Sequence, residues 1–291
     1  MNKVFVLFLS VWFVGLAAFG GDTKERPLKV FVLAGTSNML GAPAKADKLP
    51  DDLRQPMKDV LVYKNGEWTP LEAGKNLVGN EATFGRAMAK HLGEPIGIIW
   101  ISVASVSGKS PGPGINSIVK QSRDKGRPIV IAGMLVDVSY RDGIKEDTAK
   151  AYGENLVRWV ESTRKDLGNE SLPIVMNRAI PPGKGTPYLA LVRTAQDAAK
   201  IPKFRVFNCD DVPRGGDNVH FQTEGRLEMG KRFAAGMIEL MRANAPQEKS
   251  SFSPAPVIFV RERLSTFKSF NPANSFRPAS DMPSRSFRLL P

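Results

Sequence analysis

The chain has 291 residues, of which 42% are hydrophobic and 24% charged, and 41 Lys and Arg against 29 Asp and Glu give a net charge of +12. This balance excludes a wholly disordered or fibrous protein, and the length suits one large domain or two small ones. A single cysteine, Cys209, excludes a framework of internal disulfides. Two histidines exclude a His-rich metal site, and we expect no bound metal.

Residues 1–20 predict a secretory signal peptide. Lys3 precedes a run of apolar and small residues from 4 to 19, which ends in the small-x-small sequence Ala-Phe-Gly. An uncleaved anchor helix is the alternative, and both interpretations export the chain to the periplasm or the extracellular space. After cleavage we expect no stable membrane insertion. In an oxidising compartment Cys209 has no partner within the chain, so we expect it to be buried or merely tolerated.

Residues 246–291 predict a mostly disordered, basic tail. This segment contains 9 Ser and 7 Pro, sustains no apolar periodicity and carries a charge of +4. Its six Phe leave open whether it docks on the domain or on a partner. The remaining charge is spread over residues 21–245 without a block of like charges, so nucleic acid is not an expected partner. The sequence indicates no oligomeric state.

Between these ends, predicted strands alternate with predicted helices in chain order. Apolar runs rich in β-branched residues predict buried strands, and apolar residues at helical spacing predict amphipathic helices. The predicted strands are 28–34, 96–103, 128–138, 172–176 and 204–207, and the predicted helices are 80–92, 148–167, 189–199 and 223–242. This alternation indicates an α/β sandwich around a parallel sheet, with functional groups at the carboxyl ends of the strands.

Ser37 is a candidate nucleophile. The first predicted strand ends in Gly35-Thr36-Ser37-Asn38-Met39, which places a serine at the carboxyl edge of the sheet beside free backbone N–H groups. Ser and Asn after a strand are also ordinary turn or helix-cap residues, so both interpretations stay open.

Asp217 and His220 are the candidate acid and base. Asp217 stands three residues before His220, close enough to accept the ring N–H and fix the tautomer. A loop histidine beside a capping aspartate is the alternative. His91 lies near the end of a predicted helix, where a cation is favoured electrostatically, and this explains it without catalysis. Ser37, Asp217 and His220 together provide the groups for covalent acyl transfer, although no Gly-x-Ser-x-Gly motif is present.

Three stretches carry a resemblance to a known family: VFVLAGTSNMLG (30–41), GNEATFGRAMAKHL (79–92) and DNVHFQTEGRLEMGKRF (217–233). The chain resembles the sialate O-acetylesterase-type carbohydrate esterases of the SGNH (GDSL-like) hydrolase superfamily over residues 28–242. The resemblance implies a three-layer, flavodoxin-like sandwich with Ser37 as nucleophile, His220 as base and Asp217 as its partner. It also implies hydrolysis of O-acetyl esters on sugars such as sialate or xylan, without a metal or organic cofactor.

Two departures from the family pattern concern the oxyanion hole. Ala104 and Ser105 stand where the family has a Gly-Gly pair, and we expect them, with Asn38, to contact the oxyanion or the substrate. In the third motif Val138 takes the position of a side-chain amide donor, and it can donate no hydrogen bond. Losing one such donor costs about 10² to 10³ in rate.

Three further residues concern the oxyanion hole. Thr36 replaces the Gln that precedes the family's nucleophile, and Asn116 and Asn177 are candidates to supply the missing amide from elsewhere.

The sequence is therefore compatible with three functions. The first is an exported esterase that acts on acetylated carbohydrate. The second is an inactive or weakened domain that binds carbohydrate or a surface partner through the same cleft, as the degenerate oxyanion motifs suggest. The third, polyanion binding, follows from charge alone.

Overall fold

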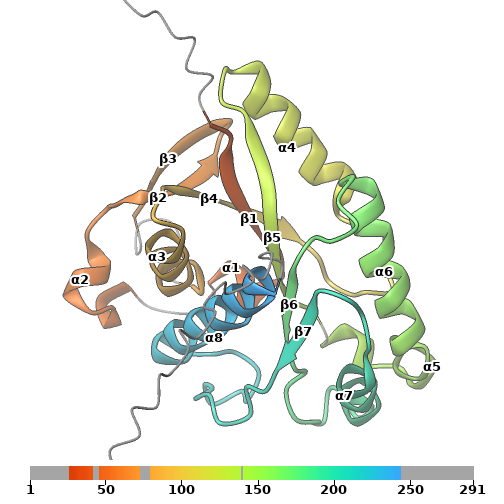
Figure 1. Ribbon diagram of the computed structural model, residues 1–291. Coiled ribbons are helices and arrows are strands. Elements are labelled where there is room, and N and C mark those ends of the chain that lie inside the picture. The colour runs from red at the N-terminus through yellow and green to blue at the C-terminus, as the bar shows by residue number, and fades with distance from the viewer. Residues whose placement is uncertain (1–25, 42–45, 73–78, 139, 244–291) are drawn as a thin grey trace, which may run out of the picture. The chain divides into compact units, whose positions relative to one another are not determined.

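A seven-stranded sheet forms the centre of the domain (Figure 1). The computed structural model describes residues 26–41, 46–72, 79–138 and 140–243, so the predicted signal peptide and tail lie outside the described residues. The strand order is β3-β2-β4-β1-β5-β6-β7, and only the β2–β3 pairing is antiparallel. The strands are β1 (Leu28–Gly35), β2 (Met57–Lys64), β3 (Glu67–Leu71), β4 (Ile96–Ser102), β5 (Ile129–Asp137), β6 (Ile174–Asn177) and β7 (Phe204–Phe207).

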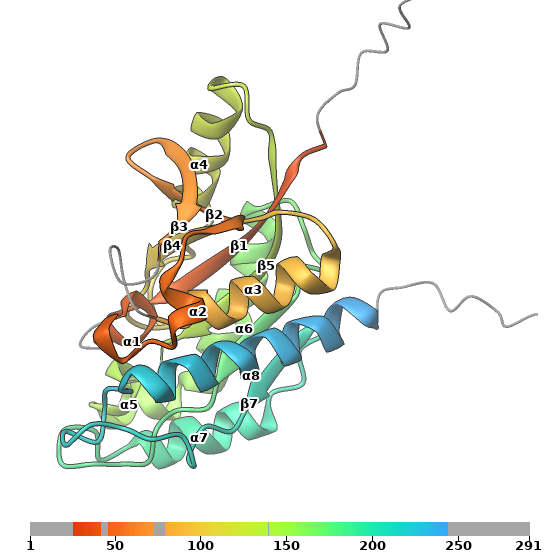
Figure 2. The ribbon, with the colours of Figure 1, turned by 90° about the vertical axis from the view of Figure 1, so that its left-hand side faces the viewer.

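Helices cover both faces of this sheet. On one face α3 and α8 lie side by side, and α4, α6 and α7 line the other face (Figures 1 and 2). The predicted α/β sandwich of three layers is therefore confirmed. None of the helices in the described ranges is long and apolar enough to span a bilayer. The helices are α1 (Ser37–Leu40), α2 (Asp51–Arg54), α3 (Glu81–Leu92), α4 (Gly112–Asp124), α5 (Glu146–Lys150), α6 (Tyr152–Asp166), α7 (Leu189–Ala198) and α8 (Thr223–Arg242).

Close packing joins α3 to α8. The Thr83 hydroxyl donates to the carbonyl oxygen of Leu227 at 2.7 Å. At Gly230 a Cβ atom would lie 2.3 Å from the carbonyl oxygen of Asn80, so only glycine allows the helices to approach this closely. Between α3 and β1, the rings of Phe84 and Phe31 pack edge to face, with their centroids 5.3 Å apart. These contacts fix α8, and with it the loop that precedes α8, against the first part of the chain.

The structure adds a hairpin that the sequence prediction lacks. Strands β2 and β3 pair antiparallel around Asn65 and Gly66, whose φ angles are 52° and 84°. An Asn-Gly pair between two alternating runs is a strong hairpin signal, because both residues tolerate positive φ. Helix α4 was likewise not predicted, since its first turn contains two glycines and a proline.

The prediction of one long helix over residues 148–167 is wrong. The chain forms α5 and α6 instead, separated at Ala151, where φ is −80° and ψ is −1°. Gly153 and the aromatic Tyr152 follow this break, and neither is a strong helix former. The other predicted strands and helices agree with the structure to within about two residues at each end.

Three strands bring their carboxyl ends to one place. Gly35 at the end of β1 pairs with Ser102 of β4 on one side and with Asp137 of β5 on the other. The segments that follow these strands therefore meet at one edge of the sheet, where ligand sites of such folds form.

Two smaller expectations also hold. Cys209 is fully buried, and His91 lies in the last turn of α3.

Candidate active site

Ser37 lies where β1 turns sharply into α1. A Cβ atom on Gly35 would lie 2.8 Å from the carbonyl oxygen of Asp137 and 2.6 Å from the Cβ of Met39, so this turn requires glycine. The amide of Leu40 donates to the carbonyl oxygen of Thr36 at 2.8 Å and closes the turn. Ser37 is thus held at the sheet edge at the start of a helical turn, as its sequence context predicted.

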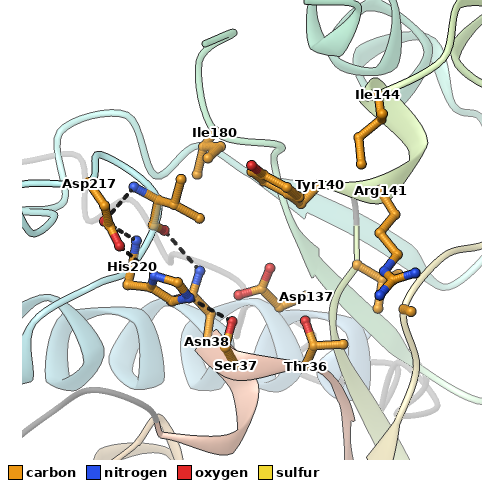
Figure 3. A pocket seen from close by; sticks show the side chains of 13 residues that line it. Thr36, Ser37, Asn38, Asp137, Tyr140, Arg141, Ile144, Ile180, Asp217 and His220 are labelled. Atoms are coloured by element: carbon orange, nitrogen blue, oxygen red, sulfur yellow. Dashed lines mark hydrogen bonds and ion pairs between the residues drawn. The ribbon is translucent and has the colours of Figure 1, made fainter. Parts of the chain in front are cut away.

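Ser37, His220 and Asp217 form a continuous hydrogen-bonded row (Figure 3). The Oγ of Ser37 lies 2.8 Å from Nε2 of His220, and Nδ1 of the same ring lies 2.6 Å from Oδ2 of Asp217. The backbone amides of Val219 and His220 both donate to Oδ1 of Asp217 at 2.9 Å. One carboxylate therefore orients the ring and the loop that carries it.

The carboxyl of Asp217 is held in its ionised form. The hydrogen bond with the His220 ring, together with those from the amides of His220 and Val219, keeps the pKa of Asp217 well below its usual range. An ionised Asp217 requires a proton on Nδ1, which leaves Nε2 of the neutral ring as an acceptor facing the Ser37 hydroxyl. This is the arrangement in which a histidine can remove a proton from serine.

Asn38 joins the Ser37 turn to the His220 loop. Its Nδ2 donates to the carbonyl oxygen of Val219 at 3.1 Å, and its Oδ1 accepts from the amide of Phe221 at 3.1 Å. The guanidinium of Arg226, fully buried on α8, donates to the carbonyl oxygens of Asn38 and Phe221. The Asn38 side chain thus lines the pocket while its polar atoms bind the two residues that flank His220.

Ala104 and Ser105 follow β4 beside this pocket. Ala104 lines it and is exposed. The Ser105 hydroxyl points elsewhere and donates to Oδ1 of the buried Asp142 at 2.5 Å, and the Ser107 hydroxyl donates to the same oxygen at 3.0 Å. These bonds fix the turn after β4 and engage the Ser105 hydroxyl, and Ser105 is not among the residues that line the pocket.

Asn116 and Asn177, the candidates to replace the oxyanion-hole amide, lie away from the pocket. Val138 lines the pocket and is 4% exposed, but it carries no donor. Asn116 donates to the carbonyl oxygen of Asp166, on the side of α4 and α6. Asn177 ends β6, where its Nδ2 donates to the carbonyl oxygen of Arg178 at 3.2 Å. Neither asparagine lines the pocket that contains Ser37.

Asp137 is the site residue that sequence reasoning missed. It ends β5, and its side chain lies in the pocket close to Ser37 and His220 (Figure 3). A single acid within the apolar run that forms β5 was the available signal, because an unpaired carboxyl is costly in a buried strand.

The pocket has a volume of about 820 Å³ and combines polar with apolar walls. Beyond Ser37 its walls include the exposed side chains of Tyr140, Arg141 and Ile144, together with Ile180 (Figure 3). A second hollow of about 580 Å³ shares Tyr140 and Ile180 and extends along residues 181–186 to Arg214. Within the described ranges, no three His, Cys, Asp or Glu side chains gather as a metal site would require.

Comparisons with known proteins agree with this architecture. A segment of 86 residues is 35% identical to a probable carbohydrate esterase of Arabidopsis thaliana, and it covers 30% of this chain and only 32% of the relative's length. The solved Arabidopsis structure superposes with a TM-score of 0.63 at 23% identity, covering 73% of this chain and 98% of the other. A carbohydrate acetylesterase from Xanthomonas citri superposes with a TM-score of 0.58 at 16% identity, over 75% of this chain and 57% of the other.

At such identities the superpositions establish the fold, whereas the family assignment rests on the sequence itself. The family model described as "Carbohydrate esterase, sialic acid-specific acetylesterase" matches residues 27–239, which include the β1 turn, α3 and the loop before α8. The resemblance inferred from the three sequence stretches is confirmed. The chain belongs to the sialic acid-specific acetylesterase family of carbohydrate esterases.

Proposed function

We propose that this protein is an exported serine esterase that removes O-acetyl groups from carbohydrate. The observation that carries the proposal is the row of hydrogen bonds from Asp217 through His220 to Ser37 at the floor of an open pocket. Membership of the acetylesterase family supports the reaction class.

In the acylation step, the Ser37 oxygen attacks the acetyl carbon and its proton moves to Nε2 of His220. Asp217 stays ionised and stabilises the imidazolium that forms. The carbonyl electrons move onto the acetyl oxygen, which becomes the oxyanion. When this intermediate collapses, the bond to the sugar oxygen breaks and the leaving oxygen takes the proton from His220.

The oxyanion is held by hydrogen-bond donors near Ser37. Ser37 begins α1, so its amide is not used by an intrahelical bond, and Ala104 is an exposed residue that lines the pocket. The amides of Ser37 and of the Ala104–Ser105 turn are the proposed donors. In deacylation, His220 removes a proton from water as the water oxygen attacks the acetyl carbon. When this second intermediate collapses, the bond to Ser37 Oγ breaks, Oγ takes the proton back from His220, and acetic acid leaves and ionises to acetate.

The walls of the pocket suit a sugar ring. Tyr140 and Ile144 present apolar surface that is 40% and 43% exposed, on which the carbon face of a sugar can pack. The adjoining hollow provides room for a neighbouring sugar or substituent. We therefore propose an acetylated sugar within a larger carbohydrate as the substrate.

Export is proposed from the sequence of residues 1–20 alone. Amino-terminal sequencing of the protein recovered from culture medium or periplasm tests it: a mature chain starting near residue 21 supports cleavage, and an intact terminus in the membrane fraction supports an anchor.

Acetate release tests the activity. p-Nitrophenyl acetate, acetylated xylan and O-acetylated sialic acid are the substrates, and Ser37→Ala is compared with the wild type. The control is Ser117→Ala, which removes an exposed hydroxyl on α4 far from the pocket. We expect acetate release by the wild type and Ser117→Ala only. Equal rates for wild type and Ser37→Ala would contradict the assignment.

A carbohydrate-binding domain without catalysis is the second candidate, because Val138 offers no donor where the family resemblance places one. A fluorophosphonate probe separates the two functions. Labelling that disappears in Ser37→Ala supports the esterase, whereas absence of labelling together with measurable sugar binding supports the binding domain.

A further inference from the structure

The side chain of Asp137 lines the pocket next to Val138, the position where the family resemblance places an oxyanion donor. Asp137 ends β5 and pairs with Gly35, two residues before Ser37. Its carboxyl lies near the Ser37 hydroxyl and the His220 ring (Figure 3). Strands β4 and β5 flank β1 in the sheet, so the end of β5 that carries Asp137 and the Ala104 turn after β4 lie on opposite sides of the end of β1. The family resemblance places a side-chain amide on the β5 side, and Val138, next to Asp137, provides none because it is apolar.

The Asp137 side chain is half-buried, and its carboxyl has few hydrogen-bond donors. Oδ1 accepts one long hydrogen bond, 3.4 Å from Nδ2 of Asn177. Oδ2 is shielded from solvent and has no hydrogen-bond partner among the residues that the structure describes. Two or three short hydrogen bonds stabilise a carboxylate in its ionised form. The exposed Asp217 accepts three of them, whereas Asp137 accepts one long bond.

The charged and titratable groups around Asp137 do not compensate for its lack of hydrogen-bond donors. Arg226 on α8 and His220 in the preceding loop favour the ionised form, as does the Asn177 hydrogen bond from β6. Cys209, after β7, remains an uncharged thiol. Burial outweighs these contributions and raises the pKa of Asp137 above its ordinary value.

We propose that Asp137 acts as a neutral carboxylic acid whose O–H donates a hydrogen bond to the oxyanion on Ser37, in place of the side-chain amide that Val138 cannot supply. This inference rests on the proposed esterase function. Asp137 keeps its proton throughout the reaction: the Ser37 proton still moves to His220, and the Asp137 O–H only stabilises the negative charge. An ionised Asp137 would instead repel the oxyanion, so its neutral form is required for activity.

A matched pair of substitutions tests this role. Asp137→Asn keeps a hydrogen-bond donor without an ionisable group, and Asp137→Leu has a similar shape without a donor. Asp59→Asn, at an exposed position of β2, is the control. The measurements are kcat for p-nitrophenyl acetate across pH and the melting temperature of the full chain.

We expect Asp137→Asn to keep kcat within about threefold of the wild type near neutral pH, and Asp137→Leu to lose about 10² to 10³. The alkaline decline of kcat in the wild type should be absent from Asp137→Asn. An active wild type with Asp137→Leu within threefold of it would overturn this inference alone, as would Asp137→Asn that is as impaired as Asp137→Leu. A wild type no faster than Ser37→Ala would overturn the proposed function as well.

Discussion

The buried guanidinium of Arg226 donates a hydrogen bond to the backbone carbonyl oxygen of Asn38, the residue next to Ser37. Through Nε it also donates to the carbonyl oxygen of Phe221, the residue next to His220, at 3.1 Å. One side chain of α8 thereby ties together the two segments that carry the proposed nucleophile and base. Each of these segments depends on the other for its position.

Arg226→Lys should lower both stability and kcat. Lysine keeps the charge but cannot direct donors to two carbonyl oxygens in a fixed geometry, so we expect a loss of about 2 kcal/mol in the free energy of unfolding and at least tenfold in kcat. Arg232→Lys is the control, since Arg232 lies on the same helix in a partly exposed ion pair with Asp211. Urea denaturation and steady-state kinetics measure the two effects, and similar behaviour of the two variants would argue against a positioning role for Arg226.

Asp217→Asn should lower kcat far more than it changes KM. The amide retains an acceptor oxygen for the loop amides but cannot stabilise the imidazolium or fix the His220 tautomer as a carboxylate does. A loss of about 10² to 10⁴ in kcat is expected. The melting temperature of the variant distinguishes this from unfolding. Near-normal kcat in a folded Asp217→Asn would exclude Asp217 as the partner of His220.

Glu81→Gln should make the protein more stable at alkaline pH. Glu81 is fully buried at the start of α3, where Oε1 accepts from the amide of Gly79 at 2.8 Å. Burial raises the pKa of Glu81 from 4.5 to about 7, so the folded state holds this proton more tightly than the unfolded state. The free energy of unfolding therefore falls as pH rises from about 4.5 to about 7, by at most about 3 kcal/mol.

Because glutamine resembles the neutral acid, the variant and the wild type should be similarly stable below about pH 4.5, diverge as the pH rises to about 7, and differ by a constant amount above it. Urea denaturation across this range measures the difference, with Glu67→Gln, at an exposed position of β3, as the control. Parallel pH profiles for Glu81→Gln and the wild type would show that Glu81 is not the group responsible.

Cys209 should be inert in the folded protein. Burial raises the pKa of its thiol to about 12, and Sγ donates to the carbonyl oxygen of Arg178 at 3.3 Å. Since the thiolate is the reactive form, an aromatic disulfide reagent should label no thiol in the native protein and one after unfolding in urea. Rapid stoichiometric labelling without denaturant would contradict this burial.

The helices and strands that could be predicted from the sequence are those whose apolar residues recur with a strong period. The apolar run of β1, broken by Lys29 alone, and the long amphipathic α8 were both predictable, because β1 is buried on both faces and α8 along one face. The β2–β3 hairpin and α4 were not predicted, since half-exposed strands and a helix that begins with glycine and proline carry weak periodic signals. The break between α5 and α6 depends on packing that a helical period does not encode.

The candidate site was predictable where a reactive side chain stands in a recognisable local sequence pattern. Ser37 follows a strand end, and Asp217 stands at the right spacing before His220. The functions of Asn38 and Arg226 were not accessible, because each acts through backbone atoms of residues more than 180 positions away. Asp137 was overlooked because its importance depends on what surrounds its carboxyl rather than on its neighbours in the chain.

The 183 positions that separate Ser37 from His220 have a consequence for biosynthesis. The proposed nucleophile leaves the ribosome early, whereas the base and the helix that anchors it emerge near the end of the domain. A chain still being synthesised therefore carries Ser37 without its proton acceptor, and activity should begin only when α8 docks. A protease cut before residue 217 that releases α8 should likewise abolish the proposed activity and leave Ser37 chemically intact.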